Sequence, residues 1–351
     1  MSLIDALRTG NFAAVEAAAA ADPAAARHPR AICEAARLAN LPAVKLFSKL
    51  GAQLNVIFRN YRPLHCLLQE DPHAAGGKPS KARLACLKWM VSHGADPELH
   101  AAWPPARALV IAAFVGVPEY VTCLESAGAK QDVFTAAALG RIEPLRKALT
   151  FSTDWVNDRD GKSLTVLQCC AGSRLPDQAT QVEIARLLLD HGADPTARTK
   201  SWGHDIEAIY LAASAKNLAL FRLLLERGAD ATEALVPALW NANLEFAAVA
   251  LEFGAKPDLA AGENKPLLNH LICWGQIPQT MWLLEHGASP NIPDPQGWTA
   301  VHQAASRGNV RMMQAVLAHG GDVTARDQNG DTPRDVAELK GREKISALLP
   351  R

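Results

Sequence analysis

The chain has 351 residues, 49% hydrophobic and 21% charged, with 36 Lys and Arg against 36 Asp and Glu. A net charge of zero excludes a strong field that would attract nucleic acid or an anionic membrane. No apolar run is long enough to cross a bilayer, and the N-terminus lacks the regions of a signal peptide. We therefore expect a cytoplasmic protein with no nucleic-acid or membrane partner, and the Ala-, Pro- and Arg-rich composition is typical of bacteria.

The seven cysteines are an odd number and are scattered along the chain. A disulfide framework needs pairs, and a zinc site needs close pairs of Cys or His. Neither pattern is present, and the neighbours Cys169 and Cys170 would diverge on a helix. We interpret the cysteines as small core residues in a reducing compartment, and we expect no metal and no cofactor.

A glycine followed by Ala or Gly returns after leucine-rich stretches along most of the chain. The last two intervals, from Gly254 to Gly287 and from Gly287 to Gly320, are each 33 residues. A fixed period of this length predicts a stack of small helical units in which each contacts its neighbours. The eight glycines of this pattern are Gly51, Gly94, Gly128, Gly192, Gly228, Gly254, Gly287 and Gly320.

In chain order the pattern predicts about eleven repeats. The second lacks a clear turn pattern, the fifth has lost its Gly-Ala pair, and the eighth is short, since Gly228 and Gly254 are 26 residues apart. The expected spans are Leu3–Arg27, Ala31–Asn55, Tyr61–Leu99, Trp103–Lys130 and Asp132–Ser152, then repeats that end near Thr196, Ala231, Asp258, Ile292 and Arg326, and a last one that starts at Gly330.

Two insertions interrupt the period, at 71–81 and at 173–180. Both fall between the paired helices of a repeat, so we expect them to protrude on one edge, because lengthening a loop costs little free energy. They are passive surface loops in one interpretation and grip a partner, or act as a lid, in the other.

The tenth repeat, residues 294–327, carries the motif most fully. Thr299 can cap the first helix, small residues let the paired helices approach, and a glycine ends each helix. Its key residues are, in order, Gly297, Thr299, His302, Ala304, Ala305, Gly308, Gly320 and Asp322. This motif resembles the ankyrin repeat, although Ala300 replaces the proline of the family's Thr-Pro-Leu-His.

The resemblance implies an all-α fold, an ankyrin-repeat solenoid of antiparallel helix pairs joined by hairpin-like finger loops. It implies one array over residues 1–351, with an N-terminal cap at 1–30, internal repeats at 31–327 and a C-terminal cap at 328–351. His65 and His302 stand where the family's imidazole bridges to a neighbouring backbone. His93, His191, His286 and His319 each precede the glycine that ends a second helix, which is a scaffold position.

Tryptophans are the most informative candidates for a binding surface. In the ankyrin family the fingers and first helices line a concave groove, and exposed aromatic residues are frequent binding hot spots. Trp89 and Trp282 lie in second helices, where we expect burial between repeats. Carried onto this chain, the groove would hold Trp103, Trp202, Tyr210, Trp240, His270, Trp274, Trp298, Gln303 and Arg307.

These patterns favour a non-enzymatic module that binds a protein partner through the groove, as an inhibitor, an immunity-type protein or a scaffold. We expect a monomer when the partner is absent. No nucleotide-binding, nucleophile-elbow or zinc-protease motif occurs in the chain. The alternative is an enzyme or small-molecule binder that uses His204, His270, Cys273 and nearby acids, although an open groove excludes water poorly.

Overall fold

The computed structural model describes residues 2–69, 79–102, 104–175, 177–201, 204–261 and 264–350. They form two compact bodies, an N-terminal body (Met1–Arg227) and a C-terminal body (Gly228–Arg351). The boundary falls where the short eighth repeat begins. The single array expected over residues 1–351 stays a prediction.

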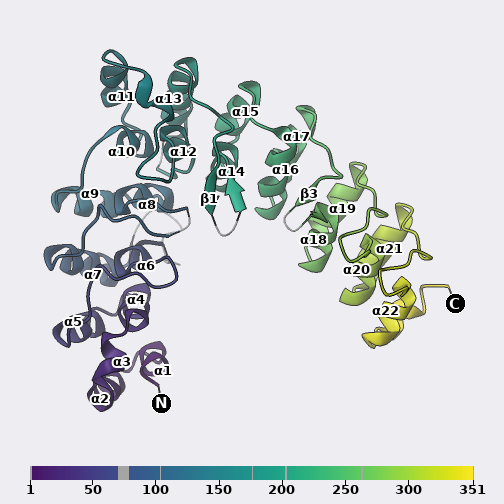
Figure 1. Ribbon diagram of the computed structural model, residues 1–351, viewed down its shortest axis with the longest axis horizontal. Coiled ribbons are helices and arrows are strands. Elements are labelled where there is room, and N and C mark those ends of the chain that lie inside the picture. Colours follow the sequence, from purple (N-terminus) through teal and green to yellow (C-terminus); the bar gives the residue numbers. More distant parts are fainter. Residues whose placement is uncertain are drawn as a thin grey trace. The chain divides into compact units, whose positions relative to one another are not determined.

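The N-terminal body consists of seven antiparallel helix pairs (Figure 1). A short helix α3 (Pro23–Arg27) follows the first pair, and a 3₁₀ turn (Asp154–Asn157) precedes the sixth. The pairs are α1 (Leu3–Arg8) with α2 (Phe12–Ala21), α4 (Pro29–Arg37) with α5 (Leu41–Lys49), α6 (Pro63–Gln69) with α7 (Lys81–Ser92), α8 (Ala108–Val115) with α9 (Pro118–Ser126), α10 (Val133–Ala138) with α11 (Ile142–Leu149), α12 (Val166–Ala171) with α13 (Gln178–Asp190), and α14 (Ala208–Ser214) with α15 (Leu218–Glu226).

The C-terminal body adds four pairs: α16 (Ala231–Trp240) with α17 (Leu244–Glu252), α18 (Leu267–Cys273) with α19 (Ile277–Glu285), α20 (Ala300–Arg307) with α21 (Val310–Ala318), and α22 (Pro333–Leu339) with α23 (Glu343–Ser346). The described residues thus contain eleven pairs, and the all-α repeat fold expected from the sequence is confirmed. The second and fifth repeats, whose patterns are weak, are helix pairs like the others.

The core of each body lies between neighbouring repeats. First helices pack on first helices, as α6 does on α4 and α8, and second helices pack on second helices, as α7 does on α5 and α9. Small side chains at the contacts let the helices approach closely. The alanine pairs 112–113, 212–213 and 304–305 are fully buried. Each repeat therefore depends on the next for the burial of its apolar faces.

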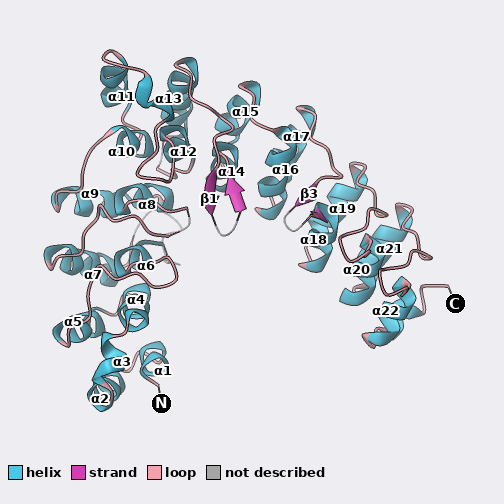
Figure 2. Ribbon diagram, viewed as in Figure 1, coloured by secondary structure: helices cyan, strands magenta, loops and turns pink. Residues whose placement is uncertain are grey.

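The finger loops contain the strands of the described chain (Figure 2). Strand β1 (Thr199–Ser201) pairs with β2 (His204–Ile206), and β3 (Ala260–Ala261) pairs with β4 (Lys265–Pro266), both antiparallel. The fingers before α10 and α16 are missing, because only a few residues separate these helices from Gly128 and Gly228. Instead, the residue directly before each helix is an aspartate that caps it, Asp132 for α10 and Asp230 for α16.

The histidines hold the scaffold positions that the sequence predicts. The Nε2 atom of His65 lies 2.9 Å from the Ala106 carbonyl, and that of His302 lies 3.2 Å from the Asp331 carbonyl, each in the next repeat. Burial lowers the pKa of His65 to about 4, so its imidazole is neutral at pH 7. At the ends of second helices, Nδ1 of His93, His191, His286 and His319 contacts the carbonyl four residues back.

Two second-helix tryptophans differ from the expectation of burial between repeats. Trp89 and Trp282 are only half-buried. Their rings stack on His93 and His286 of the same helix, with centroids 4.1 and 3.9 Å apart. The histidine that caps the helix end thus also covers the indole face.

Asparagines in the fingers clamp the following repeat, a feature that the sequence reasoning missed. Nδ2 of Asn291 donates to the Gly320 carbonyl at 2.9 Å, and its Oδ1 accepts from the Asp322 amide at 2.7 Å. Asn55 and Asn157 make the same pair of bonds to the turns at Gly94 and Gly192. One amide therefore satisfies both polar groups of the next glycine turn.

Replacing Asn291 by Ala removes both bonds, so we expect the unfolding free energy to fall by about 1 kcal/mol. The exposed Asn329 is the matched control, because among the described residues its side chain makes no hydrogen bond. Its replacement by Ala should change the free energy by less than about 0.5 kcal/mol. Urea unfolding followed by circular dichroism measures both, and equal effects would contradict the clamp.

Candidate functional site

An aromatic pair lies at the ends of two first helices in the C-terminal body. Trp240 ends α16, and Trp274 follows the last residue of α18. Their rings stack with centroids 5.9 Å apart and an interplanar angle of 15°. His270, one turn earlier on α18, meets the Trp274 ring edge-on at 6.4 Å. Trp274 is nevertheless 61% exposed, so a large flat apolar surface faces solvent there.

Two more predicted residues lie on the next first helix, α20. Arg307 is exposed, and its guanidinium lies close to the Gly275 turn, since a Cβ built on that glycine would be 3.1 Å from Nη2. Gln303 is half-buried, and its amide lies 3.5 Å from the Asp294 carboxylate. The structure thus brings Trp240, His270, Trp274 and Arg307 onto neighbouring first-helix ends.

Trp298 has a scaffold contact that its sequence position did not reveal. Its indole Nε1 donates to Oδ2 of Asp327 at 3.0 Å, in the following finger, and its ring stacks on His302 with centroids 6.3 Å apart. The side chain is half-buried. Trp298 therefore links two repeats, and its loss would disturb the fold as well as any bound partner.

The remaining predicted residues lie in the N-terminal body. Tyr210 is half-buried on α14, and burial raises the pKa of its hydroxyl. Trp103 and Trp202 lie outside the described residues, and so does most of the insertion at 71–81.

The described part of the insertion at 173–180 packs on its neighbours, where protrusion was expected. The Arg174 amide donates to the Ala113 carbonyl on α8, and its guanidinium donates to the Ser214 carbonyl on α14, both at 2.9 Å. A Cβ on Gly172 would lie 2.4 Å from the Phe114 ring, so a larger residue there would have to displace that ring. This loop therefore connects the ends of the fourth and seventh first helices.

The enzyme alternative gains no support from the described residues. His270 is engaged with Trp274, and Cys273 on the same helix is exposed. No group of three His, Cys, Asp or Glu in the described chain is placed to hold a metal ion. In the same residues, none of the helices combines the length and apolarity needed to span a bilayer.

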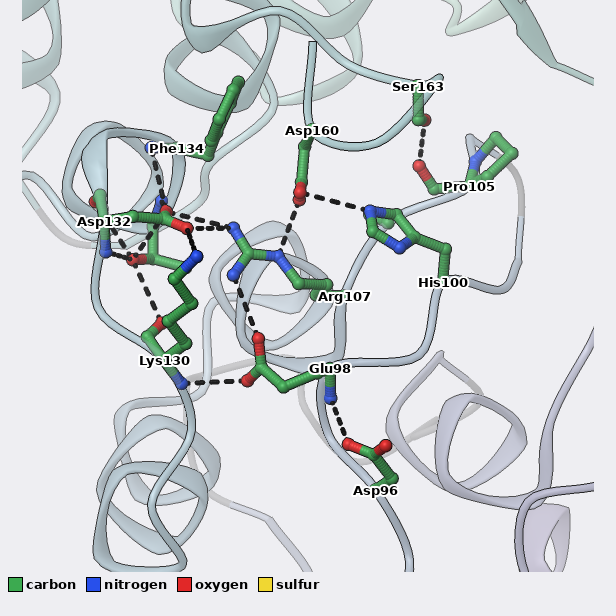
Figure 3. A network of polar contacts seen from close by, with 12 residues as sticks. Asp96, Glu98, His100, Pro105, Arg107, Lys130, Asp132, Phe134, Asp160 and Ser163 are labelled. Atoms are coloured by element: carbon green, nitrogen blue, oxygen red, sulfur yellow. Dashed lines mark hydrogen bonds and ion pairs between the residues drawn. The ribbon is translucent and has the colours of Figure 1, made fainter.

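The N-terminal body contains a buried charge network around Arg107 (Figure 3). Arg107 is 4% exposed and stands at the cap of α8, where the motif has Thr. Its Nε donates to Asp160 at 2.8 Å, Nη1 to Glu98 at 3.1 Å, and Nη2 to both oxygens of Asp132 at 2.9 and 3.0 Å. His100 Nε2 lies 3.2 Å from Asp160.

This network stands where the fifth repeat lacks a finger. Asp132 caps α10 directly, so the flanking fingers meet across the gap, with Arg107 reaching Asp160 and the Ser163 hydroxyl donating to the Pro105 carbonyl. Burial acts to raise the pKa of Asp160, but contacts with His100 and Arg107 outweigh it and hold the pKa below its usual range. The network is a structural substitute for the finger. The signals that could have found it are an Arg at a cap position and the loss of the next finger.

A shallow groove of about 750 Å³ lies on the opposite side of the repeats, between second helices α7 and α9. Lys88, Glu119 and Cys123 are among its lining residues. Burial raises the pKa of the Cys123 thiol, which keeps it protonated and unreactive at pH 7. The sequence reasoning placed no site there.

Comparisons with known proteins agree with the repeat pattern. A family model described as ankyrin repeats in many copies matches residues 283–337, and one described as ankyrin repeat matches residues 163–200. The ankyrin repeat domain of Bcl-3 superposes with a TM-score of 0.50 at 24% identity, covering 62% of this chain and 98% of that domain. This likeness concerns the fold.

Several curated proteins share parts of the sequence. The chain is 28% identical over 177 residues to SH3 and multiple ankyrin repeat domains protein 2 of Homo sapiens, covering 48% of this chain and 10% of that protein. It is 30% identical over 198 residues to the E3 ubiquitin-protein ligase KEG of Arabidopsis thaliana, covering 53% and 10%. For the potassium channel AKT1 of Oryza sativa subsp. indica the identity is 39% over 67 residues, covering 19% and 7%. The chain therefore spans a tenth or less of these relatives' lengths.

Replacing Arg107 by Met leaves three carboxylates close together without their cation. We expect a loss of about 3–5 kcal/mol in unfolding free energy at pH 7. In the wild type the lowered pKa of Asp160 contributes stability above its unfolded value of about 3.9, and that stability is lost as the pH falls through the folded pKa. In the variant Asp160 loses the guanidinium that helps to lower its pKa and takes up a proton more readily, so the deficit should shrink from pH 7 to pH 5.

Arg146→Met is the matched control for Arg107→Met. Arg146 also pairs with a carboxylate, Glu183, at 2.6 Å, but both side chains are about half exposed. We expect a cost below about 1 kcal/mol that does not change between pH 7 and pH 5. Urea unfolding at the two pH values measures the unfolding free energy of the wild type and of both variants. An Arg107 deficit as small as that of Arg146 would show that the network does not stabilise the body.

Proposed function

We propose, because the chain is an ankyrin-repeat protein, that it is a non-enzymatic module that binds a protein partner. The partner lies on the first-helix side of the repeats, and in the C-terminal body it covers the Trp240–Trp274 pair. The observation that carries this proposal is the exposed, stacked indole of Trp274. The role as an inhibitor, an immunity-type protein or a scaffold, and the cytoplasmic location, belong to the same proposal.

Physical chemistry supports this assignment of the aromatic pair. Tyr120 and Phe47 are fully buried, whereas Trp274 and Phe151 are mostly exposed, and of these last two Trp274 is the one stacked on a second aromatic ring in the described chain. Stacking on Trp240 already restricts the ring, so little rotamer entropy is lost when a partner covers it. Tryptophan is also enriched among the residues whose truncation weakens binding most.

The repeat scaffold supports binding over chemistry. Neighbouring repeats fix the first helices before any partner arrives, which lowers the entropy lost on association. A standard interface needs about 800 Å² on each side. Three or four consecutive repeats can supply such an area. The proposed partner surface also includes Trp103, Trp202 and the insertions at 71–81 and 173–180.

Replacing Trp274 by Ala should weaken partner binding about 30-fold, which corresponds to about 2 kcal/mol. Because the ring is largely exposed, the melting temperature should change little. The partner is first recovered in stoichiometric amount on the immobilised wild-type chain. Titration then measures its affinity for the wild type and for the variant. Trp298→Ala is unsuited to this purpose, because Trp298 also bonds to Asp327.

Phe151→Ala is the matched control for Trp274→Ala. Phe151 is an aromatic residue with 81% exposure that lies after α11 in the N-terminal body. Its replacement removes a similar exposed apolar surface, and we expect partner binding to remain within twofold of wild type. Unchanged binding after Trp274→Ala would place the partner elsewhere, for example in the groove between α7 and α9.

A further inference from the structure

The turns that follow the first helices of the C-terminal body carry a repeated arrangement of arginine over glycine. Arg307 lies over the Gly275 turn, and Arg342 lies over the Gly308 turn. A Cβ on Gly308 would be 2.6 Å from Cδ of Arg342, whose Nε donates to the Ser306 carbonyl at 3.2 Å. Glycine leaves the room that each side chain occupies. The two guanidinium groups are therefore placed one repeat apart, along one edge.

In the described chain, the positive charges of these two arginines are not neutralised by pairing with a neighbouring acid. Both are exposed, and among the described residues neither forms an ion pair. The nearby Arg334, in contrast, is paired with Glu338 at 2.8 Å. In sequence the exposed Lys340 precedes Arg342 by two residues, and the exposed Glu343 follows it directly. An anionic partner is the complement that this surface lacks.

The aromatic pair borders the same edge. Trp274 immediately precedes Gly275, so the exposed indole lies next to the turn that Arg307 covers. We define the Trp–Arg edge as Trp274, Arg307 and Arg342. It offers one apolar face and then two cations in successive repeats. Arginine binds carboxylates in a bidentate way, which suits it to recognise acidic side chains.

The spacing of the edge limits the form of the partner. The turns that the two arginines cover, at Gly275 and Gly308, belong to neighbouring repeats. Packed helices in neighbouring repeats lie about 8–10 Å apart, which sets the spacing of these turns. In an extended polyproline II peptide, side chains three residues apart share one face and recur about every 9 Å. Two carboxylates at positions i and i+3 therefore match the two arginines.

We propose that the Trp–Arg edge binds an extended acidic peptide segment whose carboxylates at i and i+3 contact Arg307 and Arg342, beside an apolar side chain that packs on Trp274. The inference rests on the proposed function, since the segment belongs to the protein partner. It adds the chemistry of the partner, which the proposed function leaves open.

The experiment is selection from a random peptide library displayed on phage, with the full chain as target. We expect enriched peptides to carry acidic residues three apart next to an apolar residue. Their affinity should fall about tenfold on the double replacement Arg307→Glu and Arg342→Glu, and the loss should shrink at high salt. Trp274→Ala should remove the preference for the apolar residue.

The control variant carries Lys45→Glu and Lys256→Glu, which change the net charge equally at exposed positions that are not part of the Trp–Arg edge. It should select the same peptides as the wild type, and circular dichroism should show all variants folded. Peptides that depend on Trp274 but lack an acidic bias would overturn this inference and leave the proposed function standing. A selection that enriches no peptide would also overturn it. So would a single-stranded oligonucleotide that binds through the two arginines more tightly than the peptides do.

Discussion

Every repeat in this protein depends on its neighbours to bury its apolar surface. The first helices are short and rich in small residues, so none of them could form a core alone. Close stacking also buries backbone polar groups between repeats, which must find partners there. Imidazoles such as His302 and finger amides such as Asn291 supply those partners. The motif residues therefore satisfy the interfaces, and the aliphatic residues fill them.

The fifth repeat shows how the array tolerates the loss of a finger. Its missing finger brings the loops on either side together, and Arg107 with its carboxylates fills the contact. A buried cation of this kind is favourable only because three acids and good geometry offset its desolvation. The insertion at 173–180 acts in a related way, since Arg174 connects helices of the fourth and seventh repeats. Irregular parts of the sequence thus provide long-range contacts.

Surface residues whose side chains stay mostly exposed are the natural candidates for function. Trp298 satisfies a carboxylate of the next finger, whereas Trp274 leaves most of its ring in water. The same contrast separates Arg107, which is enclosed by acids, from Arg307, which is exposed. Residue type alone does not distinguish the members of either pair. Contacts made in the folded chain do, because they show which side chains the scaffold already uses.

The sequence by itself determined the repeat fold, its eleven helix pairs and the scaffold role of the histidines, because these follow from local period and capping chemistry. It also placed Trp240 and Trp274 in consecutive repeats. Only the tertiary structure decided that their rings stack, that Trp298 bonds to Asp327 and that Arg107 joins three carboxylates. Apart from the pair Arg107–Glu98, which is 9 positions apart, these contacts join residues about 25 to 55 positions apart in the chain. Their geometry depends on how one repeat sits on the next, which a motif of 33 residues does not encode.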